Sequence, residues 1–139
     1  MDEIVHKSKF AIAKFDHEKA LYTLTYLPET ENMLDGEWKS LMKELLVVTD
    51  TFKPKYILDD NRNRRYNYPP EIQDWTLKLF IDVWNKNGLR KYVQVLPSDF
   101  IGELSAEQIL ELGNLKFSNI FENTFVKTME EATEWLDIK

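Results

Sequence analysis

The sequence lacks the residues on which many catalytic and metal centres depend. It has no cysteine, which excludes disulfides, thiolate catalysis and cysteine-ligated metal or iron–sulfur sites. Its four glycines do not cluster, so it has no P-loop and no dinucleotide-binding loop. The two histidines, His6 and His17, have no second histidine or carboxylate at the spacing that metal sites use. We therefore expect no bound metal, no cofactor and no enzymatic activity.

Charge and hydropathy restrict the partners of the 139-residue chain. Its net charge of −6 argues against nucleic-acid binding, which needs a surplus of Lys and Arg on one face. No apolar run approaches the roughly 20 residues that cross a bilayer, and the first residues, MDEIVHKSKF, do not resemble a signal peptide. With 4 Trp, 6 Tyr and 8 Phe, the chain has ample material for one packed core. We expect a single cytoplasmic domain over residues 1–139, with no nucleic-acid partner and no membrane insertion.

Hydropathy patterning predicts alternating strands and helices. Tyr22 and Leu24 belong to a run in which large apolar residues alternate with others at the period of a half-buried strand. Trp38, Leu41 and Leu45 recur at the spacing of an amphipathic helix. With proline and glycine as boundary signals, the same criteria predict strands over residues 9–15, 21–27, 55–59, 91–96 and 121–126, and helices over residues 34–51, 69–87, 105–112 and 129–136.

These elements predict an α/β fold. An N-terminal β-hairpin comes first and strands and helices then alternate, so the order is ββαβαβαβα. We expect a mixed sheet of about five strands with four helices packed on it, and parallel pairing among the later strands. Functional loops in such sheets lie at the carboxyl ends of parallel strands. Residues 59–68 and 97–104 occupy those places.

The charged loop over residues 59–68 is the most informative segment. Two carboxylates come first, and three arginines follow within four residues, interleaved with tyrosines. The carboxylates suit a hard cation or basic groups of a partner, and the arginines suit phosphate or carboxylate groups. The alternative is that these charges pair with one another and shape the turn. The candidate partner-binding residues of the loop are Asp59, Asp60, Asn61, Arg62, Arg64, Arg65, Tyr66 and Tyr68.

The second long predicted helix is apolar on more than one side. Trp75, Leu79 and Val83 form one line, and Phe80 with Trp84 forms another about 100° around the helix. A sheet face covers the first line, so the second needs a neighbouring helix, a partner or a second copy of the chain. We therefore add Trp84 to the candidate partner-binding residues as an exposed anchor, and a two-fold homodimer is one way of covering it.

Four segments of the sequence carry a family resemblance, and they are YILDDNR (56–62), PEIQDW (70–75), GLRKYV (88–93) and EEATEWL (130–136). They resemble the STAS domain family, which includes the bacterial anti-sigma-factor antagonists. The closer resemblance is to small stand-alone STAS-like proteins whose fold is akin to lipid-transfer domains. In the antagonists a Ser or Thr in an Asp-Ser-x-Gly-like turn is phosphorylated to switch partner binding. This chain has Asp59-Asp60-Asn61-Arg62 there, without the hydroxyl or the glycine.

Two functions follow from these observations. The leading hypothesis is a regulatory, non-enzymatic protein-interaction module of STAS-like type that contacts a protein partner through the charged loop and the start of the predicted helix over residues 69–87. The alternative is a small-molecule or lipid-binding protein, for which the fold would have to provide an apolar pocket with a few convergent polar groups. An enzyme would have only Asp59 and Asp60 as acid–base residues.

Overall fold

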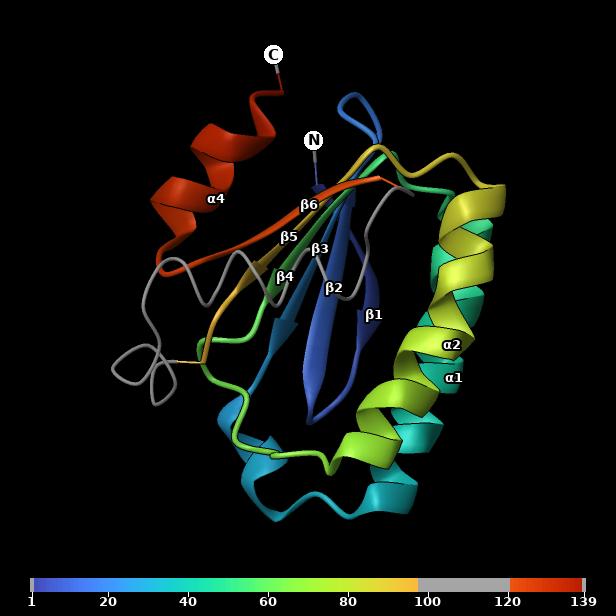
Figure 1. Ribbon diagram of the computed structural model, residues 1–139, viewed down its shortest axis with the longest axis vertical. Coiled ribbons are helices and arrows are strands. Elements are labelled where there is room, and N and C mark those ends of the chain that lie inside the picture. The colour runs from blue at the N-terminus through green and yellow to red at the C-terminus, as the bar shows by residue number, and fades with distance from the viewer. Residues whose placement is uncertain (1, 98–120, 139) are drawn as a thin grey trace.

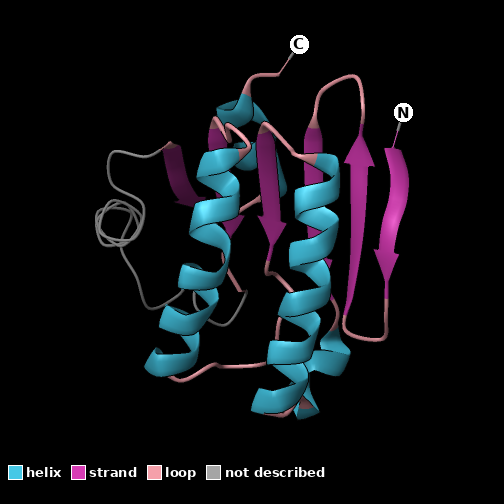
Figure 2. Cartoon of the chain, turned by 90° about the vertical axis from the view of Figure 1, so that its right-hand side faces the viewer, coloured by secondary structure: helices cyan, strands magenta, loops and turns pink. Residues whose placement is uncertain are grey.

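The chain forms three layers. The computed structural model describes residues 2–97 and 121–138, in which a central sheet has helices on both sides (Figure 1). Two long helices lie side by side across one face of the sheet, and a short one lies behind it (Figure 2). Within the described residues, no helix combines the length and apolar character needed to span a membrane. The helices are α1 (Asp35–Phe52), α2 (Pro70–Lys86) and α4 (Met129–Leu136).

The sheet has six strands, arranged in the order in which they follow along the chain. The first three pair antiparallel, and the third to the sixth pair parallel. The α/β class, the mixed sheet and the parallel direction of the later strands are therefore confirmed. The strands are β1 (Asp2–Lys7), β2 (Ala11–Asp16), β3 (Leu21–Tyr26), β4 (Tyr56–Asp60), β5 (Lys91–Val95) and β6 (Glu122–Val126), and a short 3-10 helix, η1 (Pro28–Asn32), follows β3.

The predicted count of about five strands omits β1. This strand lies at the edge of the sheet and its first three residues are exposed, so it carries no clear apolar–polar alternation. A register shift between Ile4 and His6 further interrupts the pattern. Three helices and η1 lie in the described residues, against four predicted helices. The fourth prediction, residues 105–112, lies outside the described residues.

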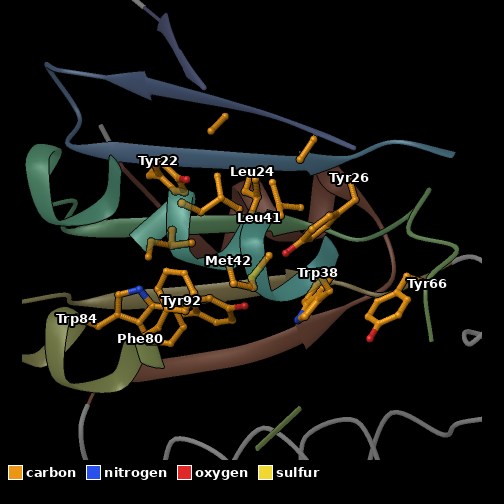
Figure 3. Packing of buried hydrophobic residues seen from close by; sticks show 14 of the residues in the cluster. Tyr22, Leu24, Tyr26, Trp38, Leu41, Met42, Tyr66, Phe80, Trp84 and Tyr92 are labelled. Carbon is orange, nitrogen blue, oxygen red and sulfur yellow. The ribbon is translucent and has the colours of Figure 1, made fainter. Parts of the chain in front are cut away.

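Strand alternation assigns the side chains of the central strands to the two helical layers. Tyr22, Leu24 and Tyr26 of β3 are buried beneath α1 and α2, as their spacing predicts. On β5, Tyr92 belongs to the same large core, whereas Val93 packs in the smaller core under α4. Figure 3 shows the large core, in which aromatic rings from the sheet meet rings from both helices.

Polar side chains join α1 and α2 near both of their ends. The Trp38 indole Nε1 donates to Thr76 Oγ1 at 2.9 Å near the beginning of the helices. At the other end, the Asn87 amide Nδ2 donates to Asp50 Oδ1 at 3.1 Å. Gly88 follows α2 with φ of +73°, the left-handed conformation that its position predicts. These links hold the two helices in a fixed relation above the sheet.

The orientation of α2 about its axis differs from the prediction. Phe80 and Trp84 face the sheet, and Trp84 is only 9% exposed. Its indole lies 5.0 Å from the Tyr92 ring and 5.8 Å from the Phe121 ring, measured between centroids. The assignment of Trp84 as an exposed anchor is therefore wrong. Both apolar lines satisfy helical periodicity, and the aromatic side chains that the sheet presents decide which line packs against it.

The other line of α2, which we call the outer line, is less buried than Phe80 and Trp84 but is not a free surface. Trp75, Leu79 and Val83 are half-buried, Trp75 and Leu79 pack against the large core, and the Lys39 ammonium lies 5.2 Å from the centroid of the Trp75 ring. The neighbouring helix α1 thus covers part of this line. The homodimer remains a prediction, and the buried Phe80 and Trp84 are not available to form it.

We expect Trp84→Glu to destabilise the fold by about 3 kcal/mol or more, because it removes a large buried ring and places a charge among aromatic side chains. Val83→Glu is the matched control on the outer line and should cost about 1 kcal/mol. Urea denaturation followed by circular dichroism measures both changes. A Trp84→Glu protein that is as stable as Val83→Glu would contradict the burial of Trp84.

Candidate functional site

The register of the sheet brings one acidic residue beneath the two long helices. Leu24, Asp59 and Gln94 stand side by side on β3, β4 and β5. Two residues earlier, Ile57 pairs with Tyr92 on the same face. Side chains alternate between the faces of a sheet, so Asp59 points in the same direction as Ile57, which belongs to the core under α1 and α2. A carboxylate therefore enters an otherwise apolar layer.

A pocket of about 270 Å³ lies between this sheet face and helices α1 and α2. Aromatic rings form much of its wall, among them Tyr22, Tyr26, Trp38 and Tyr92. In Figure 3 the Tyr26 and Tyr92 side chains extend from the sheet into the space between the two layers. Asp59 contributes a carboxylate to the lining. The pocket thus combines aromatic walls with a small number of polar groups, as small-molecule sites do.

The Asp59 carboxylate has only part of its hydrogen-bonding capacity satisfied. The Tyr92 hydroxyl donates to Oδ2, whereas Oδ1 is buried and has no hydrogen-bond partner among the described residues. Burial of the carboxylate raises the pKa of Asp59 to about 6, although the Tyr92 hydrogen bond, the positive charge of Arg64 and the Asn61 side chain oppose this shift. The neighbouring carboxylate of Asp60 raises it further. The residue as a whole is half-buried, because it lines the pocket, but its Oδ1 is buried. A buried carboxylate oxygen without a partner is unusual in a core that serves packing alone.

The rest of the charged loop is held largely by its own side chains. Arg62 binds the Asp60 carboxylate with two side-chain hydrogen bonds, both of 2.9 Å. Arg64 donates from Nε to Asn61 Oδ1 at 2.6 Å and from Nη1 to the Tyr66 carbonyl. These contacts match the alternative interpretation of the loop, in which its charges pair with one another.

Asp59 and Asp60 do not form an acid–base pair or a cation site together. Asp60 is 2% exposed and is engaged by Arg62, whereas Asp59 lines the pocket and contacts Tyr92. Consecutive strand residues point to opposite faces, which separates the two carboxylates. In residues 2–97 and 121–138, no three or more His, Cys, Asp or Glu side chains gather as a metal site requires.

Two aromatic side chains of the loop pack against Trp38, and one of them, Tyr68, lines the pocket. The Tyr66 and Tyr68 rings lie 5.0 and 5.3 Å from the Trp38 ring, measured between centroids. The Tyr66 hydroxyl donates to Asp35 Oδ1 at 2.5 Å, which ties the loop to the first turn of α1. The Arg64 guanidinium lies 4.6 Å from the centroid of the Tyr68 ring. The loop is therefore part of the wall of the site as well as its surface.

The structure divides the predicted partner-binding residues into two groups. Those lining the pocket are Asp59, Asn61, Tyr68 and Trp84. The other group lies in the loop outside the lining, where Arg62 and Arg65 are exposed and Arg64 is half-buried, and it comprises Asp60, Arg62, Arg64, Arg65 and Tyr66. Their role in binding a partner stays a prediction.

The sequence alone does not identify several of the pocket residues, because they occupy positions that its periodicity assigns to the core. Tyr22, Tyr26 and Tyr92 occupy buried strand positions of this kind. Gln94 is likewise buried and lines the pocket. A hydroxyl or amide at a position that periodicity assigns to the core is the signal that points to such a site.

No family model, curated protein or solved structure matches this chain. The resemblance to the STAS family thus stays an expectation, and the pocket is interpreted from its own geometry.

We expect the stability of the protein to fall as the pH rises from about 4 to about 6, through ionisation of Asp59. The folded state, with the pKa of Asp59 raised to about 6, binds more protons in this interval than the unfolded state, whose aspartates titrate near 3.9. Asp59→Asn removes the effect, so the variant should gain about 2–3 kcal/mol over the wild type above pH 6 and nothing at pH 3.5. Urea denaturation at a series of pH values measures the difference, and a difference independent of pH would show that the carboxylate is not buried.

Proposed function

We propose that this protein binds a small organic molecule with an aromatic or apolar body in the pocket between the sheet and helices α1 and α2. The observation that carries the proposal is the Asp59 carboxylate, which lines a largely aromatic pocket with Oδ1 buried and unpaired. A buried polar atom without a partner costs about 1–3 kcal/mol. A ligand that donates a hydrogen bond to Asp59 would offset this cost.

The size of the pocket supports a compact ligand. An apolar cavity of about 150 Å³ accommodates benzene, and this pocket has about 270 Å³. One ring with a short substituent, or two fused rings, matches that volume. Planar rings of Tyr26, Trp38 and Tyr92 in the walls favour aromatic ligands through offset or edge-to-face contacts.

A long-chain fatty acid fits the site less well. Its carboxylate would meet the carboxylate of Asp59, and like charges in an apolar environment repel strongly. Its acyl chain would also extend beyond a space that holds one or two rings. Of the two ligand classes that the sequence suggests, a small molecule is therefore favoured over a lipid.

The protein-interaction hypothesis stays a prediction and is less well supported. Arg62 and Arg65 are exposed beside the pocket, but much of the charged loop is bound within the chain. Asp60 is bound by Arg62, and Arg64 binds Asn61. A partner would therefore meet a loop whose polar groups are largely satisfied, whereas a small molecule would meet Asp59 in the wall of an aromatic pocket.

Filling the pocket should abolish binding. Leu77 lines the pocket from α2, so Leu77→Trp places a larger ring in the space that a ligand would use. We expect p-cresol, indole or 2-naphthol to shift the backbone amide resonances of Asp59 and Gln94 in the wild type. The variant should bind the same compound at least ten-fold more weakly. Titration followed by ¹H–¹⁵N correlation spectra measures both affinities.

Leu79→Trp is the matched control, because Leu79 is a half-buried residue of the same helix that does not line the pocket. This variant should bind as the wild type does. Far-ultraviolet circular dichroism confirms that both variants are folded. If none of the three compounds shifts these resonances, or if Leu77→Trp binds them as the wild type does, the proposed site is wrong.

A further inference from the structure

We infer that the polar group of the ligand is a protonated amine, so that the site selects aromatic amines over neutral alcohols and carboxylic acids of the same shape. This inference rests on the proposed function, and it concerns the chemical class of the ligand. Three features of the described residues support it: the sign of the charges in the lining, the engagement of the nearest arginine, and the density of aromatic rings.

The charged side chains in the described lining of the pocket are both acidic. Asp59 lies within the pocket, and Asp74 of α2 contributes at its rim. Asp74 is exposed and pairs with Lys78 at 2.9 Å, so its charge is partly neutralised there. No lysine or arginine is among the described lining residues. The pocket therefore presents negative charge to whatever enters it, and the chain as a whole carries a net charge of −6.

The arginine whose charge acts on Asp59 is already engaged. Arg64 donates hydrogen bonds to Asn61 Oδ1 and to the Tyr66 carbonyl, and its guanidinium stacks on the Tyr68 ring. It is not a lining residue. Its charge reduces the negative potential at Asp59, but it gives no hydrogen bond to that carboxylate among the described contacts. A ligand cation can therefore supply the direct charge-assisted bond that Arg64 does not.

Aromatic rings around the carboxylate complete a site suited to a cation. Tyr26, Trp38 and Tyr92 line the same pocket as Asp59, and the negative faces of aromatic rings attract ammonium groups. The tyrosines stay uncharged, because burial raises the pKa values of Tyr26 and Tyr92 well above the usual range. Their hydroxyl oxygens can accept hydrogen bonds from the second and third donors of an ammonium group.

An ammonium group fits Asp59 better than the other polar groups that a small ligand carries. A carboxylate would be repelled, and a neutral hydroxyl would donate one weaker hydrogen bond. Charge-assisted hydrogen bonds are about twice as strong as neutral ones. A difference of 1.4 kcal/mol corresponds to a ten-fold change in affinity, so we expect at least that preference for an amine.

The test compares three probes that share one ring and a short side chain: 2-phenylethylamine, 2-phenylethanol and phenylacetate. Their dissociation constants are measured at pH 7.5 by titration of ¹H–¹⁵N spectra of the wild type and of Asp59→Asn. The amine should bind the wild type at least ten-fold more tightly than the alcohol, and phenylacetate should bind most weakly. In Asp59→Asn the preference for the amine over the alcohol should disappear.

Each other result overturns a defined part of the account. Equal binding of amine and alcohol, or tighter binding of phenylacetate, would refute the amine and leave the proposed small-molecule site intact. A preference for the amine that persists in Asp59→Asn would refute the role of Asp59. If none of the three probes binds, and p-cresol, indole and 2-naphthol do not bind either, then the proposed function itself fails.

Discussion

The position of the Asp59 carboxylate beneath α1 and α2 is the constraint on which the rest of the structure depends, with Oδ1 buried and the residue half-buried at the wall of the pocket. Strand alternation directs the Asp59 side chain toward the two helices, because Ile57 and Asp59 share a face of β4 and Ile57 is a core residue. An ionised carboxylate in such a layer is costly unless other groups bind it. Tyr92 satisfies one oxygen from the adjacent strand, and the pocket beside it gives access to a ligand. The same placement explains the raised pKa, the incomplete hydrogen bonding and the proposed selectivity.

The surrounding structure keeps this arrangement rigid. The links between Trp38 and Thr76 and between Asp50 and Asn87 fix the two long helices relative to each other near both ends. The loop after β4 contributes the stacked rings at one end of the pocket, and its charges are largely satisfied internally, so it holds a defined shape. A site with fixed walls selects ligands by shape and charge and loses little conformational freedom on binding. The stability lost by burying Asp59 is thus consistent with a binding role, since functional sites often reduce the stability of a fold.

Much of the fold could be predicted from local patterns in the sequence. Hydrophobic periodicity and the residues at element boundaries depend on neighbours along the chain, so they can be recognised without knowing how the elements pack. The alternation in β3, the helical spacing of α1 and the glycine after α2 all predicted the observed elements. The edge strand β1 was missed, since an exposed strand does not need an apolar face. The predicted orientation of α2 was wrong because two apolar lines satisfied the same period, and only the sheet distinguishes them.

The pocket could not be predicted, because it depends on the register of β3, β4 and β5 and on how far α1 and α2 lie above them. The position of the charged loop was predicted, but the inward direction of Asp59 requires knowing which face of β4 lies beneath α1 and α2.

The central claim is that Asp59 is a buried carboxylate within a site that accepts a cation. The most direct test is a titration of its side-chain carboxyl ¹³C resonance by NMR, with and without saturating 2-phenylethylamine. The account predicts a midpoint of about 6 in the free protein, and a lower midpoint with the amine bound, because a neighbouring cation favours the ionised form. A midpoint near 4 in the free protein, as for an exposed aspartate, would contradict the burial of this carboxylate. An amine that binds without moving the midpoint would contradict its contact with Asp59.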